Sequence, residues 1–333
     1  MSQGSLEVSF ERILVHVRER AREYFPEIGA VAGLRVVEAH YRSRSQVYRV
    51  AIDDGRRGGR EVVIKISNAA PKQFRAMMDV WPHFASQPTW KIPRPLDCLE
   101  EWRVLVMERV PGSPLPACLP RVAWGRRRLR AAETACRRAG QWLRFYHDLA
   151  ASEEPRPLDV PAKLDGLAES LRELERGGFD RRSCQTLAER IGPLADHLRG
   201  EPLRISHLHG DYSADNVLVD DRQVTVLDLW ATDRNAVIHD IASFLNSLLF
   251  LRLTRLVPFS ALRRLREAFL GGYFGSEHPQ EKAIAALQAI GFVDVTLEIL
   301  GRRRSAAARA WLEHVFAGGM EAITCLGETG RGA

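Results

Sequence analysis

The stretch that decides the fold is His209-Gly210-Asp211-Tyr212-Ser213-Ala214-Asp215-Asn216. Short apolar segments at 205–208, 217–219 and 224–227 surround it, and their β-branched residues predict strands. The rest of the second half of the chain shows apolar residues at helical spacing, so this region is a non-helical island. Its polar residues are concentrated in the connections between the strands, where side chains that perform chemistry are often found.

Three oxygen-bearing side chains in this island point to phosphoryl transfer: Asp211, Asn216 and Asp228. Asp228 follows Val226-Leu227 at the end of the last predicted strand. Phosphoryl transfer needs a carboxylate beside the attacking hydroxyl and oxygen ligands that hold Mg²⁺ against the nucleotide phosphates. We therefore predict Asp211 as the catalytic residue, and Asn216 and Asp228 as Mg²⁺ ligands. The alternative that all three only form turns is disfavoured by the joint match of identity, spacing and strand context.

One lysine far upstream completes this set. Lys65 ends the apolar segment Val62-Val63-Ile64-Lys65 and is one of only five lysines in an Arg-rich chain. A single lysine in a strand usually lies at the surface. Its place in an apolar strand before the catalytic island instead favours contact with the α- and β-phosphates of a nucleotide.

The first third of the chain has the pattern of a small antiparallel sheet with helices. The predicted strands are 34–37, 46–52, 61–66, 92–96 and 103–107. Apolar residues at helical spacing predict helices at 6–25 and 71–85. The sequence Val110-Pro111-Gly112-Ser113-Pro114 then interrupts the pattern, and nearly everything from residue 121 onward is helical in period.

Several motifs together resemble the aminoglycoside phosphotransferase and choline kinase-like family. Residues 106–115 resemble the family's lobe-connecting segment, 140–147 its helix before the catalytic region, 209–219 its central motif, and 239–242 its downstream Asp-bearing helix. The resemblance runs from about residue 34 to at least residue 250. It implies an α+β, protein-kinase-like fold with an N-terminal helical extension at 1–33, a nucleotide-binding lobe at 34–109 and a helical lobe at 110–333.

The resemblance also implies ATP and Mg²⁺ as cofactors. The implied nucleotide-binding residues are Lys65, Ser43, Ser45, Val63, Glu108, Val110 and Leu218. The backbone of 108–110 would bind the adenine, Val63 and Leu218 would cover its faces, and the turn at 41–46 would cover the phosphates. Ser213 stands where protein kinases usually carry a lysine, which favours a small-molecule acceptor and makes a protein kinase the weakest alternative.

Two departures from the family pattern affect the prediction. The predicted helix at 71–85 has no glutamate to pair with Lys65, and Asp79 is its only acid. This absence keeps open a catalytically quiet nucleotide-binding pseudokinase or scaffold. The second departure is Leu229-Trp230 after Asp228, where the family usually has phenylalanine; Leu229 can fill the same apolar role.

The predicted function is ATP-dependent transfer of the γ-phosphoryl group to a hydroxyl of a sugar, an amino alcohol or a related metabolite. Aminoglycosides are polycations, and an enzyme specialised for them should present carboxylates to them. The helices after Trp230 are at least as rich in Arg as in Asp and Glu, so an aminoglycoside antibiotic kinase ranks below a metabolite kinase.

Composition excludes several other classes. The net charge of +6 comes mainly from arginine runs that look like solvated helix faces, so no nucleic-acid partner is expected. The five cysteines form no C-x-x-C pair, which argues against zinc or a disulfide framework and fits the cytoplasm, as does the lack of a signal pattern. The apolar run at 241–257 is interrupted by Asn246, Arg252 and Arg255, so we expect a core helix and no membrane span. The sequence leaves the oligomeric state open.

Overall fold

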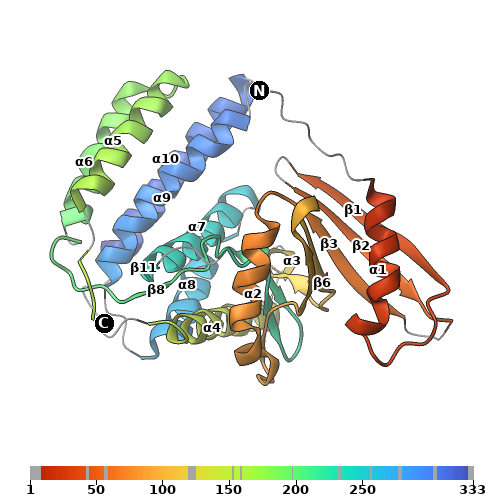
Figure 1. Cartoon of the computed structure of the whole chain (residues 1–333). Coiled ribbons are helices and arrows are strands. Elements are labelled where there is room, and N and C mark those ends of the chain that lie inside the picture. The colour runs from red at the N-terminus through yellow and green to blue at the C-terminus, as the bar shows by residue number, and fades with distance from the viewer. Residues whose placement is uncertain are drawn as a thin grey trace. The chain divides into compact units, whose positions relative to one another are not determined.

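The chain forms two units in this computed structural model. Unit 1 is Met1–Gly112 with Thr225–Ala231, and unit 2 is Ser113–Val224 with Thr232–Ala333. The structure describes residues 9–42, 45–55, 59–118, 125–151, 154–157, 160–196, 198–230, 234–255, 257–276, 280–302 and 306–328. Figure 1 labels the helices and several of the strands.

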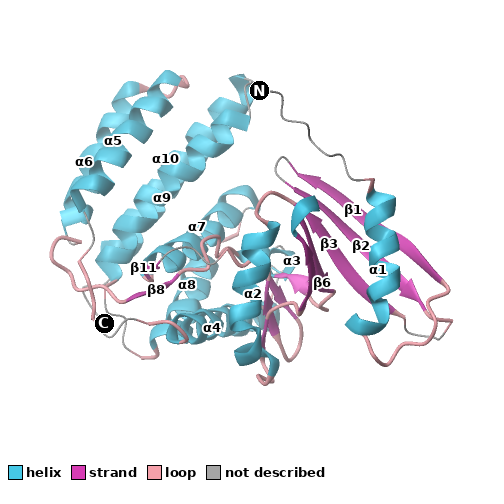
Figure 2. Cartoon of the chain, in the orientation of Figure 1, coloured by secondary structure: helices cyan, strands magenta, loops and turns pink. Residues whose placement is uncertain are grey.

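Unit 1 is built on a five-stranded sheet in the order β1-β2-β3-β6-β5 (Figure 2). Its strands are β1 Gly33–Arg42, β2 Ser45–Asp53, β3 Arg60–Ile66, β5 Pro95–Leu99 and β6 Val104–Glu108. Every neighbouring pair is antiparallel, as the sequence predicts. The first strand is longer than the predicted 34–37, and a register shift between Val36 and Glu38 interrupts its pairing with β2. Unit 1 also contains β4 Trp90–Lys91 and the 3₁₀ turn Glu100–Trp102.

The helix α1, Phe10–Tyr24, packs on this sheet. It begins where the Ser9 side chain accepts a hydrogen bond from the Glu11 amide, a common way for a helix to start. Ile13, Val17 and Ala21 recur on one face and are at most 1% exposed. They share a hydrophobic core with alternate residues of the central strands, namely Val50, Ile52, Val62, Ile64, Val104 and Val106. One face of the sheet is therefore covered by α1.

A half-buried carboxylate also holds α1 to the edge strand β5. Asp97 accepts hydrogen bonds from Tyr24 Oη at 2.7 Å and from His16 Nε2 at 2.9 Å. Burial raises the pKa of Asp97, but these two bonds and one from the Cys98 amide outweigh it and hold the pKa below its ordinary value. The hydroxyl of Tyr24 has a raised pKa because it is buried beside this carboxylate.

We expect Asp97→Ala to destabilise unit 1 by about 1.5 to 3 kcal/mol, because it leaves the buried Tyr24 hydroxyl without its acceptor. Unfolded Asp97 binds a proton at a higher pH than folded Asp97, so its contribution is complete above the ordinary Asp pKa of about 3.9 and is lost as the pH falls below it. Urea unfolding at pH 7 and pH 3.5 measures both effects. In Tyr24→Phe the Asp97 substitution should cost less, and equal costs in both backgrounds would contradict the assigned contact.

Unit 2 is mostly helical. Its helices are α3 Leu115–Cys118, α4 Arg126–Asp148, α5 Val160–Arg176, α6 Arg181–Asp196, α7 Ile238–Arg255, α8 Phe259–Phe274, α9 Glu281–Arg302 and α10 Ala306–Glu328. The helices α4 and α8 approach closely, since a Cβ added to Gly140 would lie 2.2 Å from the Phe269 carbonyl oxygen. Short strands interrupt the helices: β7 Ser113–Pro114 pairs with β9 Val217–Val219, and β8 Ile205–His207 pairs with β11 Arg234–Ala236. The α+β class expected from the sequence is confirmed.

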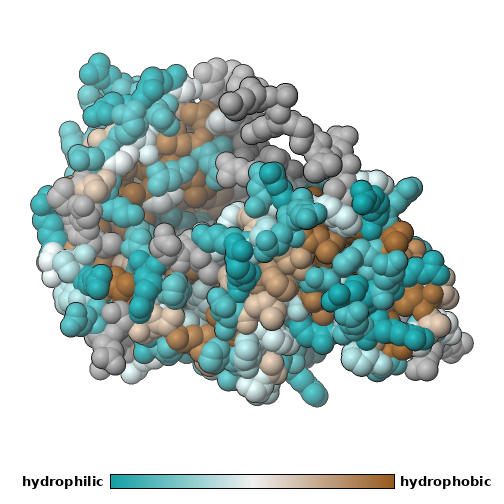
Figure 3. Space-filling model, in the orientation of Figure 1, coloured by the Kyte–Doolittle hydropathy of each residue, from teal (hydrophilic) through white to brown (hydrophobic). Residues whose placement is uncertain are grey.

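Two apolar helices of unit 2, α7 and α9, pack against each other. As expected for the run at 241–257, α7 is a core helix, and Ile241, Phe244 and Leu248 are at most 2% exposed. The segment Glu281–Gly301 of α9 is long and apolar enough to cross a membrane, but 61% of its most apolar window is buried and α9 contacts α5, α6, α7 and α10. Figure 3 shows hydrophobic residues over α9 and α10, where Val295 and Trp311 are partly exposed. This packing is typical of a core helix.

Candidate active site

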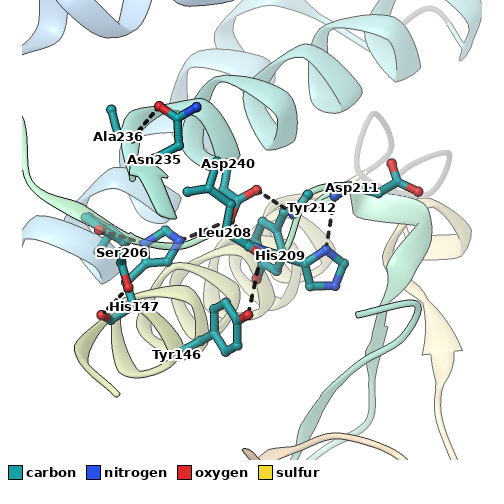
Figure 4. A network of polar contacts seen from close by, with 12 residues as sticks. Tyr146, His147, Ser206, Leu208, His209, Asp211, Tyr212, Asn235, Ala236 and Asp240 are labelled. Carbon is teal, nitrogen blue, oxygen red and sulfur yellow. Dashed lines mark hydrogen bonds and ion pairs between the residues drawn. The ribbon is translucent and has the colours of Figure 1, made fainter. Parts of the chain in front are cut away.

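The predicted catalytic loop connects β8 to the 3₁₀ turn Ala214–Asn216 and to β9. Its shape depends on Gly210, whose φ of +86° lies in the left-handed region that favours glycine. A buried carboxylate holds the loop from α7: Asp240 Oδ2 accepts the His209 amide at 2.6 Å, and Oδ1 accepts the Gly210 amide at 3.1 Å. Two consecutive peptide groups are thus fixed by one side chain (Figure 4).

The carboxylate of Asp240 is itself held by a histidine and a tyrosine. His147 Nε2 lies 3.0 Å from Asp240 Oδ2, and His147 Nδ1 lies 2.9 Å from the Tyr273 hydroxyl. Burial lowers the pKa of His147, so the ring is neutral. Burial raises the pKa of Asp240, but the hydrogen bonds from the His147 ring and from the His209 amide outweigh it and keep the pKa below its ordinary value, so the carboxyl stays ionised. A neutral ring that donates from Nε2 must accept at Nδ1, so Tyr273 is the donor of the second bond.

The two predicted functional residues of the loop lie in contact. Asn216 Nδ2 donates to the Asp211 carbonyl oxygen at 2.9 Å and to Asp211 Oδ2 at 3.1 Å. Asn216 is 8% exposed, whereas Asp211 is exposed. Because the amide nitrogen makes both bonds, Asn216 Oδ1 is the atom that remains for a metal. The Asp211 side chain points away from the His209–Asp240 contacts in Figure 4, so it is positioned by the network without belonging to it.

Two aromatic residues that support this loop were not identified from the sequence as site residues. Tyr212 is fully buried, donates its hydroxyl hydrogen to the Ala139 carbonyl oxygen at 2.7 Å and stacks on Trp142 at 5.7 Å between ring centroids. His209 is also fully buried, and its Nδ1 accepts the Asp211 amide at 3.3 Å. These contacts make His209 a residue that supports the loop backbone. The only sequence signal for Tyr212 was its place inside the motif.

In unit 1, the predicted lysine meets the second predicted acid. Lys65 Nζ lies 2.7 Å from Asp228 Oδ1, although the two residues are 163 positions apart. Lys65 is 6% exposed, and an ammonium so far from water requires such a partner. Asp228 has a φ of +56°, a left-handed conformation that Asp tolerates better than most residues. The helix that could have supplied a glutamate is α2, Ala70–Ala85, and its one acid, Asp79, is exposed.

The remaining predicted nucleotide contacts are distributed over both units. Val63 is half-buried on β3, two residues from Lys65, and therefore on the same face of the sheet. The amide of Glu108 donates to the Arg94 carbonyl oxygen at 2.9 Å, and the amide of Arg109 to the Glu61 carbonyl oxygen at 3.1 Å. These two N–H groups of the connecting segment are thus used within unit 1.

Three other predicted nucleotide-binding residues lie in strands or next to them. Val110 is half-buried after the end of β6, and Ser45 begins β2. Leu218 lies on β9 of unit 2, where it pairs with Pro114. Ser43 lies outside the described residues.

The predicted groups therefore form two contacting pairs. Lys65 and Asp228 belong to unit 1, and Asp211 and Asn216 belong to unit 2. Among the residues that the structure describes, no group of three or more His, Cys, Asp or Glu could hold a metal ion. A Mg²⁺ ion needs no such group when one or two protein oxygens are joined by water and nucleotide phosphates, so the oxygen donors present fit this ion.

Comparisons with known proteins show which family and which structures the chain resembles. Residues 39–284 match the model of the phosphotransferase enzyme family. A choline kinase from Cryptosporidium parvum Iowa II has a similar structure, with a TM-score of 0.60, 10% identity and coverage of 97% of each chain. An aminoglycoside phosphotransferase in a ternary complex with AMP-PNP and hygromycin B gives a TM-score of 0.55 at 17% identity, over 91% of this chain and 98% of that one. A glucosamine kinase has a TM-score of 0.53 at 14% identity, with coverage of 89% of this chain and 92% of that one. No match was found among curated proteins.

Proposed function

The chain belongs to the phosphotransferase enzyme family, and from this premise we propose that it is an ATP-dependent small-molecule kinase. The family resemblance seen in the sequence is thereby confirmed, and the neighbouring structures have the expected kinase-like fold. The proposed reaction transfers the γ-phosphoryl group of ATP to a hydroxyl of a sugar, an amino alcohol or a related metabolite in the cytoplasm. The observation that carries the proposal is the contact of Lys65 with Asp228, because two motifs far apart in the sequence meet as a phosphate-binding pair requires.

In the proposed mechanism, Asp211 accepts a hydrogen bond from the attacking hydroxyl, orients it toward the γ-phosphorus and takes its proton, while ADP leaves as the new P–O bond forms. Asn216 Oδ1 and the Asp228 carboxylate would hold Mg²⁺, which supplies charge neutralisation at the phosphate oxygens. Lys65 would contact the α- and β-phosphates when Asp228 turns to the metal. Each of these roles depends more on the exact position of the side chain than on its intrinsic reactivity. The buried Asp240 side chain supports such positioning, because it holds two peptide groups of the catalytic loop.

For the adenine, we propose that the carbonyl oxygen of Glu108 and the amide of Val110 make the hydrogen bonds. The amides of Glu108 and Arg109 already donate to Arg94 and Glu61, so the segment 108–110 has these backbone groups left for the task. Val63 on β3 and Leu218 on β9 would contact the faces of the ring, and Ser43 and Ser45 the phosphates. These contacts stay proposals carried by the family pattern.

The charge of the second half supports a metabolite over an antibiotic as acceptor. Residues 231–333 contain 11 Arg against 10 Asp and Glu. A site that binds a polycation gains from an excess of carboxylates, and this region has none. The aminoglycoside phosphotransferase and the glucosamine kinase among the similar structures differ from this chain by more than four-fifths of aligned residues, so they support the fold and leave the acceptor open.

A MgATP-consumption screen over sugars, amino alcohols and aminoglycosides tests this proposal. We expect turnover with at least one neutral or singly charged hydroxyl compound and none with the Asp211→Ala protein. Turnover confined to aminoglycosides would identify an antibiotic kinase instead. Binding of MgATP in a thermal-shift titration without transfer to any compound would favour the catalytically quiet scaffold, the alternative motivated by the missing helix glutamate.

A further inference from the structure

The helix α2 contains a buried side chain whose polar atoms are not used. Gln73 is 1% exposed, and neither Oε1 nor Nε2 has a hydrogen-bond partner among the described residues. Buried polar groups are almost always paired, and an unpaired amide destabilises the folded protein. An apolar residue would fill this place at lower cost in stability. A buried polar residue without a partner, like Gln73, is typical of sites where function competes with stability.

Gln73 lies on the same side of the sheet as Lys65. Ile64 and Val62 of β3 belong to the core under α1, so by strand alternation Lys65 points to the opposite face. Its cross-strand neighbour on β6 is Leu105, which is 1% exposed and flanked by Val104 and Val106 of the α1 core. The helix α2 packs on β5 and β6 and covers this opposite face. The buried side of α2 and the Lys65 side chain therefore both lie in the space between α2 and this face of the sheet.

The chain path keeps Gln73 close to the end of β3. Ser67, two residues after Lys65, accepts the Ala70 amide through its carbonyl oxygen, and α2 begins at Ala70. Gln73 is in the first turn of this helix, only eight residues after the lysine, and its own amide donates to Ala69. The hydroxyl oxygen of Ser67 is also buried without a partner among the described residues. Unused polar atoms thus gather where β3 leads into α2.

We propose that Gln73 is a positioning residue for Lys65 in the nucleotide-bound enzyme, in place of the glutamate that α2 lacks. In the structure Asp228 holds the ammonium at 2.7 Å. With Mg²⁺ bound, the Asp228 carboxylate would be engaged by the metal, and Gln73 Oε1 would accept a hydrogen bond from Lys65, whose three N–H groups can serve the amide and the phosphates together. A neutral amide orients the lysine without cancelling its charge, which stays available to the triphosphate. This inference rests on the proposed nucleotide site.

The test compares Gln73→Met with Gln73→Glu. In the nucleotide-free protein, Gln73→Met should raise the melting temperature by a few degrees, because it removes an unpaired buried amide. The same variant should bind Mg·AMP-PNP about tenfold more weakly by calorimetry and raise KM for ATP without changing KM for the acceptor. Gln73→Glu should restore nucleotide affinity to within about threefold of the original. Met77→Leu, a volume-conserving change on the same buried face of α2, should change neither quantity.

Repeating the Gln73→Met change in the Lys65→Met variant distinguishes this inference from the proposed function. In Lys65→Met, the Gln73→Met change should have no further effect on Mg·AMP-PNP affinity, because the amide acts through the lysine. If Gln73→Met leaves affinity unchanged while Lys65→Met lowers it, the positioning role is wrong and the nucleotide site stands. If Lys65→Met itself binds Mg·AMP-PNP normally, the proposed function fails. A lower melting temperature for Gln73→Met with unchanged affinity would show that the amide is a structural group, which also overturns the inference.

Discussion

Replacement of Asp211 by Asn should lower kcat by about 10³-fold, within the range for loss of a general base, and leave MgATP affinity within about threefold. The carboxylate is the only group proposed to contact the acceptor hydroxyl. Asn at 211 keeps an oxygen that can accept the Asn216 amide hydrogen, so the hydrogen bond of 3.1 Å between these side chains can persist. Steady-state kinetics with the acceptor found in the screen, together with calorimetric binding of Mg·AMP-PNP, measure both quantities.

The same loop offers a matched control. Asp215 is exposed, acidic and next to Asn216, but no chemical role is proposed for it. Asp215→Asn should retain kcat within about twofold, as expected of a surface substitution away from the reacting groups. If Asp211→Asn and Asp215→Asn lose activity to the same extent, the loss comes from the changed net charge of the loop and not from a specific role of Asp211. If Asp211→Asn keeps full turnover, the acceptor hydroxyl is oriented by another group and the assignment of Asp211 is wrong.

The short-range features of the site were predictable from the sequence. The loop between β8 and β9 is encoded by residues next to one another, with Gly210 for the left-handed turn and β-branched residues for the strands. The sheet of unit 1 follows from alternation and turn residues in the same way. Strand ends were less predictable, as β1 shows, because pairing with β2 extends it beyond its own apolar residues.

The side-chain partners of buried charged groups could not be predicted because they come from distant segments. Asp240 is contacted by His147 of α4 and by the amides of the catalytic loop, and Tyr273 of α8 in turn contacts His147. No local pattern specifies that His147 should contact both Asp240 and Tyr273. Likewise, the sequence showed that α2 lacks a glutamate, but only the fold shows that Lys65 is paired with Asp228. A buried charge needs a partner, and the tertiary structure decides which residue that partner is, so only the folded chain reveals it.

Replacement of Asp240 should produce the largest loss of stability. In Asp240→Leu the amides of His209 and Gly210 and the Nε2 hydrogen of His147 all lose their acceptor in a site that is 2% exposed. Removal of one member of a buried charged network costs about 3 to 5 kcal/mol. Urea unfolding measures this cost. Tyr273→Phe removes only the outermost hydroxyl and should cost about 1 kcal/mol, so an equal cost for the two variants would contradict the central role of Asp240.

The stability of this network should also depend on pH. Folded Asp240 and folded His147 both have lowered pKa values, so each binds its proton at a lower pH in the folded chain than in the unfolded chain. The unfolded chain therefore binds more protons in acid, and stability must fall as the pH drops below the ordinary His pKa of about 6.5 and then below that of Asp. Asp240→Leu removes the Asp part of this dependence, and its unfolding free energy should vary less below pH 4. A steeper decline than in the original protein would contradict the ionised state of Asp240.

Activity distinguishes positioning from chemistry at this site. Asp240→Asn keeps one acceptor oxygen but turns a donor toward the other bonds, so we expect a weaker loop and a kcat about tenfold lower in the folded fraction, since misplacement of reacting groups is costly. Asp211→Asn should lower kcat far more while leaving the unfolding free energy within about 0.5 kcal/mol, as for other exposed positions. Asp240 fixes the backbone on which Asp211 stands, so the two variants must separate in this way. If Asp240→Asn unfolds less readily than Asp211→Asn, the carboxylate does not hold the loop.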